Sequence, residues 1–347
     1  PTTCRRQRQM CIRDRYNLNK RDLPWRYKGN SKKDPYKIWV SEIMLQQTTV
    51  TAVIPYFKKF ITLWPNIEKL SSADINEILD FWSGLGYYRR AKNLHLTSKI
   101  INKEYKNIFP KDESQIKNLP GIGDYTSAAI RAIAFNKDDT VVDSNIERII
   151  ARIFQIEEPI IRAKKEIKEK AKKLTPNKKN GDYIQALMDI GSMVCLPKNP
   201  LCNLCPVLEF CKAKKNSCEN TIPIKIKKKI KPVREGSVYW IISSDNKVLL
   251  KRRVDKGILP GMLEFPSYGW STDGNEEIDK KVLSIKDFKR KEGKVSHQFS
   301  HFNLLLTVYE KKEFNVNDIN GMWVDKKDLN NLGLPTLMKK VFNHINT

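Results

Sequence analysis

The sequence predicts two domains: an all-α domain that carries a four-cysteine metal loop, and a small α+β domain after it. Three observations support this. From Tyr16 to about Ala213, apolar residues recur at three- and four-residue spacing with short Pro or Gly interruptions. Five of the seven cysteines fall between positions 195 and 218. Beyond residue 235 the pattern changes to short runs that are typical of β-strands.

These patterns predict individual elements and the limits of each domain. The clearest expected helices are 38–53, 91–101, 126–135 and 146–154. The second domain is expected to contain strands at 237–243, 247–252, 304–309 and 322–324, with a closing helix at 336–345. The helical domain then covers 16–215 and the α+β domain 236–347. Between them, 216–235 is rich in lysine and proline and indicates a basic linker.

Residues 1–15 are expected to lie outside the fold. They carry five arginines, show no periodic apolar face and do not begin with Met. A fragment of a targeting peptide is one interpretation. An artefact of the gene model is favoured, because the serine enrichment of transit peptides is missing.

The net charge is strongly positive. Lys and Arg number 64 against 39 Asp and Glu, a formal charge of +25. A nucleic acid is the partner that such an excess favours. A lysine-rich proteome would produce the same balance, so the charge alone does not decide. No apolar run is long enough for a membrane span, and no secretory segment is present, so we expect a cytoplasmic protein.

Four cysteines form the strongest local signal. Cys195, Cys202, Cys205 and Cys211 follow a C-x6-C-x2-C-x5-C spacing, with prolines between them. Four thiolates in one loop bind zinc or an iron-sulfur cluster. A 4Fe-4S cluster is favoured, because zinc sites usually consist of two C-x2-C pairs with a longer separation.

A second signal is the segment 119–126, which joins two helical patterns. Gly121 and Gly123 let backbone amides at a helix N-terminus approach an anionic oxygen. The segment therefore predicts a phosphate-binding hairpin. An ordinary helix-turn-helix corner also needs glycine, so this motif is weak by itself.

The motifs together resemble a known family. Residues 119–128 resemble the helix-hairpin-helix of the endonuclease III superfamily of DNA glycosylases, the four-cysteine loop has that superfamily's spacing, and Asp143 follows the hairpin at the distance of its catalytic aspartate. Residues 39–48 and 84–88 resemble the adenine DNA glycosylases of the MutY family. This resemblance covers residues 22–347, and the second domain looks like a Nudix fold.

The resemblance implies a reaction in which two carboxyl groups have different tasks. Glu42 is expected to protonate adenine as a general acid, since the apolar residues around it would desolvate its carboxylate. Asp143 is expected to stabilise the positive charge that develops on the sugar. Without the family, Glu42 would be interpreted as a surface residue and Asp143 as the N-cap of the helix that follows it.

The same resemblance assigns the surrounding residues. Trp25, Arg26, Tyr125 and Asn145 are expected to complete the adenine pocket. Tyr125 stands where the strand-cleaving glycosylases have a Schiff-base lysine, so little or no lyase activity is expected. The residues that fill the space left by the flipped base, contact DNA or probe 8-oxoguanine opposite adenine are expected to be Gln47, Tyr87, Gly121, Gly123, Phe299, Ser300 and His301.

Two other functions compete with this interpretation. A pyrimidine glycosylase with lyase activity would share the hairpin, Asp143 and the cluster, but it would not need Glu42 or the second domain. A non-catalytic DNA-binding protein would need Glu42 or Asp143 to be lost, and both are present. The favoured hypothesis is a monomeric, bacterial-type repair enzyme that acts on duplex DNA with A:8-oxoguanine or A:G mispairs.

Overall fold

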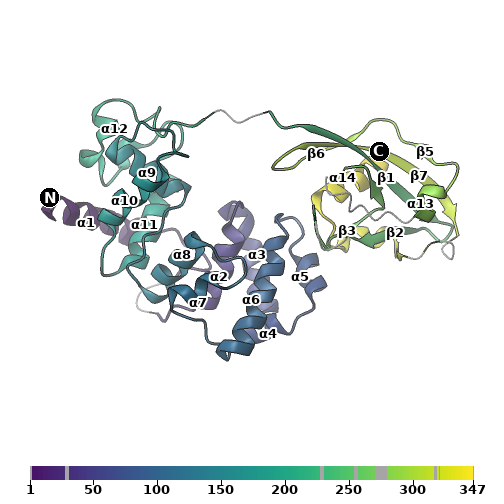
Figure 1. Cartoon of the computed structure of the whole chain (residues 1–347), viewed down its shortest axis with the longest axis horizontal. Coiled ribbons are helices and arrows are strands. Elements are labelled where there is room, and N and C mark those ends of the chain that lie inside the picture. The colour runs from purple at the N-terminus through teal and green to yellow at the C-terminus, as the bar shows by residue number, and fades with distance from the viewer. Residues whose placement is uncertain are drawn as a thin grey trace. The chain divides into compact units, whose positions relative to one another are not determined.

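The structure is a computed structural model that describes residues 2–27, 31–226, 230–253, 257–270, 280–315, 319 and 321–346. The chain divides into two compact units, Pro1–Ser71 with Leu96–Lys228, and Ser72–His95 with Lys229–Thr347. The first unit is built from helices and the second contains the β-sheet (Figure 1). The predicted fold class, a helical domain before a domain with a sheet, is therefore confirmed.

The N-terminal segment differs from our expectation. Helix α1 (Thr2–Asn19) packs along α11 (Asn180–Met193). Ile12 and Tyr16 are only 1% and 5% exposed and belong to the core of the first unit. The prediction that residues 1–15 lie outside the fold is thus wrong for this structure. Two apolar side chains one helical turn apart form no recognisable stripe among the arginines, and only the neighbouring helix shows that they are buried.

Helices α2 (Pro35–Leu45) and α3 (Val50–Leu63) replace the single helix expected over 38–53. The chain breaks at Gln47, whose φ of 59° lies in the left-handed region. Thr49 then caps α3 by accepting a hydrogen bond from the amide of Ala52. The break matters for the site, because it leaves the end of α2 and the start of α3 on the wall of one cavity.

The remaining helices of the first unit are α4 (Ile67–Ser71), α7 (Glu113–Lys117), α8 (Asp124–Phe135), α9 (Ser144–Phe154), α10 (Lys164–Leu174) and α12 (Lys212–Lys215), with 3-10 turns at Cys202–Leu204 and Leu208–Phe210. Helix α11 packs against both α8 and α9, and α2 packs against α8. Four isoleucines on one face of α9 are buried in this core, and burying each contributes about 1.5–3 kcal/mol. This packing brings the N-terminal ends of α8 and α9 near the middle of α2.

The second unit is organised around two long strands, β1 (Val233–Ser243) and β7 (Asn303–Phe314), which run parallel (Figure 1). The expected strand 247–252 and helix 336–345 are confirmed with those bounds as β2 (Lys247–Arg252) and α14 (Thr336–Ile345). The other elements are β3 (Leu263–Glu264), β4 (Ser267–Tyr268), α13 (Lys280–Ser284), β5 (Lys289–Arg290), β6 (Val295–Gln298), β8 (Met322–Asp325) and a 3-10 helix (Lys326–Asn331). The short strands that pattern analysis missed have two to four residues, too few for a visible alternation.

The boundaries of the units differ from those expected. The segment with α5 (Ile75–Phe81) and the start of α6 (Arg89–Tyr105) belongs to the second unit, where Arg252 pairs with Asp80 at 3.0 Å and Ser83 Oγ donates to the carbonyl of Leu334 at 2.5 Å. Strand β1 begins inside the expected linker. Residues 227–229 of that linker lie outside the described residues. Within the ranges that are described, no helix is long and apolar enough to cross a membrane.

Candidate active site

Glu42 lies between two cavities of the first unit. Helix α2 places its side chain in a largely apolar setting, and the residue is only 6% exposed. The outer cavity is lined by Glu42 together with Tyr125, Asp143 and Asn145. The inner cavity is lined by Glu42 with Trp25, Arg26 and apolar side chains. The structure therefore brings together all six residues to which the sequence assigned catalysis and the adenine pocket.

The carboxyl group of Glu42 is suited to hold a proton. Burial raises its pKa to about 7, and the negative charge of Asp143 acts in the same direction. The hydroxyl of Tyr125 donates to Glu42 Oε2 at 3.2 Å and opposes the rise, as does the positive charge of Arg26. Desolvation outweighs both, so a substantial fraction of Glu42 is protonated near neutral pH. Such an acid can donate a proton to a leaving base.

Asp143 occupies the N-cap of α9. Its Oδ1 accepts the backbone hydrogen of Ile146 at 2.7 Å, and its Oδ2 accepts a hydrogen from Asn145 Nδ2 at 2.9 Å. The capping role expected from sequence is thus observed. Both oxygens accept N–H groups, and the positive end of the α9 dipole is nearby, which suits an ionised carboxylate.

Asn145 is held by a second contact that leads to the cysteine loop. Arg148 Nη2 donates to Asn145 Oδ1 at 3.0 Å, while Arg148 Nε donates to the carbonyl of Cys195 at 2.7 Å. A Cβ at Gly191 would lie 2.4 Å from Asn145 Cβ, so only glycine lets α11 approach this closely. Asp143, Asn145 and Arg148 therefore form a continuous connection between the outer cavity and the first cysteine.

The four cysteines line one small cavity. As the described side chains stand, no group of three or more His, Cys, Asp or Glu could hold a metal ion. All four are nevertheless free thiols, and Arg152 Nη1 donates to Cys195 Sγ at 3.2 Å. Burial raises the pKa of Cys205 to about 11, which favours the neutral thiol in this structure, and a bound cation would favour the thiolate instead. The donor set and its convergence on one cavity fit a metal or an iron-sulfur cluster.

The hairpin between α7 and α8 has the form that the glycines predicted. Gly121 has a φ of 78°, which a side chain would strain, and Gly123 is the N-cap of α8. A Cβ at Gly123 would meet nothing within 4 Å, so no neighbouring group of the described chain requires glycine at this position. Asp124 follows in the first turn and pairs with Lys117 at 2.8 Å, which offsets its negative charge at this end of the helix.

The loop predicted to probe 8-oxoguanine lines a cavity of the second unit. Phe299, Ser300 and His301 line this cavity together with Tyr87. Tyr87 lies in a glycine-rich turn and has a left-handed φ of 48°. The hydroxyls of Tyr87 and Ser300 are 2.9 Å apart. Gln47, the other residue predicted to fill the stack, lies in the first unit, on the wall of the outer cavity.

Comparisons with known proteins agree with this geometry. Residues 40–177 match the model of the HhH-GPD superfamily of base excision DNA repair proteins, and residues 237–344 match the NUDIX domain. An adenine DNA glycosylase of Buchnera aphidicola from Schizaphis graminum is 36% identical over 94% of this chain and 95% of its own length. The chain belongs to the adenine DNA glycosylase family. It is a DNA glycosylase of base excision repair, as predicted.

A second curated relative and two solved structures are also similar to this chain. The human enzyme is 29% identical over 94% of this chain and 72% of its own length. A thermostable thymine-DNA glycosylase superposes with a TM-score of 0.56 at 30% identity, over 62% of this chain and 98% of its own. Endonuclease III in a non-covalent DNA complex shares the fold, with a TM-score of 0.50 at 18% identity over 61% of this chain and 97% of its own.

Pattern analysis missed four residues at the site of this adenine DNA glycosylase family member. Arg21 lines both cavities, and Gln185 and Met188 of α11 line the inner one. Asp189, on the same helix, binds both Arg21 and Arg26. The available signal was the spacing of 185, 188 and 189, which places these residues on one helical face. That spacing does not distinguish a pocket wall from ordinary core packing.

Proposed function

We propose that the chain removes adenine paired with 8-oxoguanine or guanine in duplex DNA. The flipped adenine enters beside Glu42, and the bond between its N9 and the sugar C1′ is hydrolysed. The observation that carries the proposal is a buried carboxylic acid with a pKa of about 7, on the same cavity as Asp143. One carboxyl group can be protonated while the other is ionised, which this reaction requires.

The chemical step follows from those two states. Glu42 donates its proton to N7 of adenine, and the base leaves with the electron pair of the N9–C1′ bond. The sugar then carries positive charge, which the carboxylate of Asp143 stabilises electrostatically. Water adds its oxygen to C1′ and loses a proton, which leaves an abasic site. Trp25, Arg26 and Asn145 orient the base and the carboxylates.

Tyr125 supports a monofunctional enzyme. A lysine at this position would attack C1′ and form a Schiff base that leads to strand cleavage. The phenol instead donates its hydrogen to Glu42, and burial raises its own pKa well above the ordinary value, so it is no nucleophile at neutral pH. Water is therefore the nucleophile, and the strand breaks only when alkali is added.

The cysteine loop is proposed to hold a 4Fe-4S cluster through Cys195, Cys202, Cys205 and Cys211. When bound, the cluster supplies a fixed structural centre for the loop. Arg152 Nη1 donates to the sulfur of Cys195 and would stay beside this sulfur when it binds the cluster. Arg148 then has a fixed carbonyl to bind, and so holds Asn145 against Asp143.

The remaining assignments concern the mispair. Gln47 and Tyr87 are proposed to fill the stack when adenine leaves it, and Gly121 and Gly123 to let the hairpin amides bind phosphate. Phe299, Ser300 and His301 are proposed to recognise 8-oxoguanine, with the Tyr87 to Ser300 contact orienting the loop. We expect a monomer that acts on the chromosome in a bacterial cytoplasm.

Single-turnover cleavage of a duplex with adenine opposite 8-oxoguanine tests the proposal. We expect adenine release by the native chain, a loss of release in Glu42→Gln, and strand breaks only after alkali. A duplex with an oxidised pyrimidine is the control substrate, and it should remain intact. Excision of the pyrimidine with adenine untouched would contradict the proposal and support the lyase alternative.

A further inference from the structure

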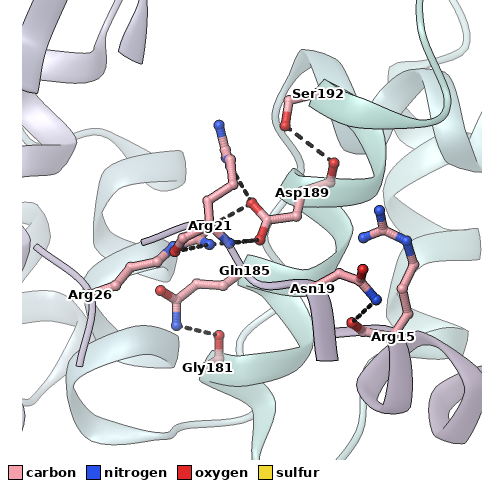
Figure 2. A network of polar contacts seen from close by, with 8 residues as sticks. All are labelled: Arg15, Asn19, Arg21, Arg26, Gly181, Gln185, Asp189 and Ser192. Atoms are coloured by element: carbon pink, nitrogen blue, oxygen red, sulfur yellow. Dashed lines mark hydrogen bonds and ion pairs between the residues drawn. The ribbon is translucent and has the colours of Figure 1, made fainter. Parts of the chain in front are cut away.

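Asp189 binds two arginines at once. Its side chain is fully buried on α11, and Oδ1 accepts Arg21 Nε at 2.5 Å. Arg26 approaches the same carboxylate with both terminal nitrogens, at 2.6 and 2.8 Å (Figure 2). The backbone amide of Arg21 adds a contact of 3.3 Å to Oδ2. This paired geometry is the strongest form of an arginine-carboxylate interaction.

The carboxylate itself lies behind the base-binding cavities. Arg21 lines both cavities and Arg26 lines the inner one, whereas Asp189 lines neither. Tyr16 lines neither cavity, and its ring centroid lies 5.7 Å from the guanidinium of Arg26. Asp189 therefore acts on the cavity only through the two arginines.

From this arrangement we infer that Asp189 is a positioning residue, which fixes Arg21 and Arg26 at the cavity wall and balances their charge beside Glu42. The inference rests on the proposed function, because it concerns the acid that would protonate adenine. It assigns a positioning task to a residue that lines neither cavity and contacts neither of the two catalytic carboxyl groups.

Charge balance explains why the task is needed. Two guanidinium groups beside a buried carboxyl would favour its ionised form, and an ionised Glu42 has no proton to donate. The described groups that shift the pKa of Glu42 are Tyr125 on α8, Asp143 before α9 and Arg26 before α2. Arg21 adds a second positive charge on the wall of both cavities that Glu42 lines. From α3 the cavity receives only the apolar Val50. Asp189 neutralises the charge of one of the two arginines, and this keeps the local positive charge low enough for Glu42 to retain its proton.

Three variants separate this electrostatic role from a merely structural one. Asp189→Asn leaves both arginine charges uncompensated, so the alkaline limb of the pH-rate profile should move to lower pH. Arg21→Gln leaves Asp189 paired with Arg26 alone, and the limb should move to higher pH. The double variant loses one negative and one positive charge together, so the alkaline limb of its pH-rate profile should return towards that of the native chain.

The experiment measures single-turnover adenine release from pH 5 to 9 for the native chain and all three variants. We expect shifts of about one pH unit in opposite directions, which at alkaline pH lowers the rate of Asp189→Asn about tenfold relative to the native chain. Limbs that coincide with the native one in both single variants would overturn the inference.

Folding is checked by circular dichroism and thermal unfolding. Removal of one partner from a buried pair can prevent folding of Asp189→Asn, and in that case the double variant is compared with Arg21→Gln, because these two differ only in the charge of Asp189. A native chain that releases no adenine would contradict the proposed function. A native chain with a normal alkaline limb and unshifted variants would contradict only the role of Asp189.

Discussion

Tyr125 donates its hydroxyl hydrogen to Oε2 of Glu42 at 3.2 Å, across 83 positions of sequence. The contact joins the start of α8 to the middle of α2, and it favours the charged form of the acid that the reaction needs protonated. Burial must therefore raise the pKa of Glu42 by more than this hydrogen bond lowers it. The balance between the two can be measured.

Replacing Tyr125 by Phe removes only that hydrogen bond. The pKa of Glu42 should rise, because a contact that stabilises its ionised form is lost. The alkaline limb of adenine release should move to higher pH by at most about one unit, the equivalent of one hydrogen bond. A pH-rate series under single-turnover conditions measures the shift, and a limb displaced to lower pH would contradict this account of the site.

Glu42 should also lower the free energy of unfolding at alkaline pH. Its pKa is raised from 4.5 to about 7 in the folded state, so the folded chain binds this proton more tightly than the unfolded chain. The stabilising contribution is full below pH 4.5 and is lost as the pH rises through 7. It amounts to about 3 kcal/mol.

Glu42→Gln should therefore unfold at a higher temperature than the native chain at pH 8, with a smaller difference near pH 5. Thermal unfolding at the two pH values measures this. Glu157→Gln, a change at an exposed glutamate of the same unit, is the control and should show no such pH dependence. Equal unfolding temperatures of native chain and Glu42→Gln at pH 8 would be inconsistent with a buried acid.

The two tasks of Asp143 can be separated by two substitutions. Asparagine can still cap α9 but carries no charge, so Asp143→Asn should fold normally and lose at least about a hundredfold in single-turnover rate. Asp143→Ala should lose the rate and also about 1 kcal/mol of stability, because the cap is gone. Chemical denaturation and adenine release are measured on both. A fully active Asp143→Asn would exclude the electrostatic role.

Arg148 connects the cysteine loop to Asn145, so replacing it should lower the activity of the site. Arg148→Lys keeps the charge but cannot bind both the Cys195 carbonyl and Asn145, so we expect a tenfold to hundredfold lower rate of adenine release. Arg131→Lys, at the Arg131 to Asp139 pair of the same unit, is the matched control and should stay close to native activity. Equal losses in the two variants would indicate a general effect on folding.

Local patterns were sufficient for much of the architecture. The isoleucine face of α9 repeats with helical spacing over the whole element, and β2 is a short apolar run between basic residues, so both were predictable. The break at Gln47 was not, because it depends on a left-handed residue within a polar stretch, 46–49, in which no Gly or Pro marks the end of a helix. The burial of Ile12 and Tyr16 likewise required the surface of α11.

At the site, residue types and motif order were enough to name Glu42, Asp143, Tyr125 and the cysteines as candidates. The helix sequence alone favoured a surface position for Glu42, because it does not say which neighbours cover the side chain, and only the family resemblance favoured a catalytic acid. The fold decided this by packing α8 and α9 against α2 and α11. It also decided the role of α11, where Asp189 acquires its two arginine partners from a loop 163 and 168 positions away. Sequence determines which groups are available for chemistry, whereas long-range packing determines their desolvation and pairing, and these set the charge states on which the reaction depends.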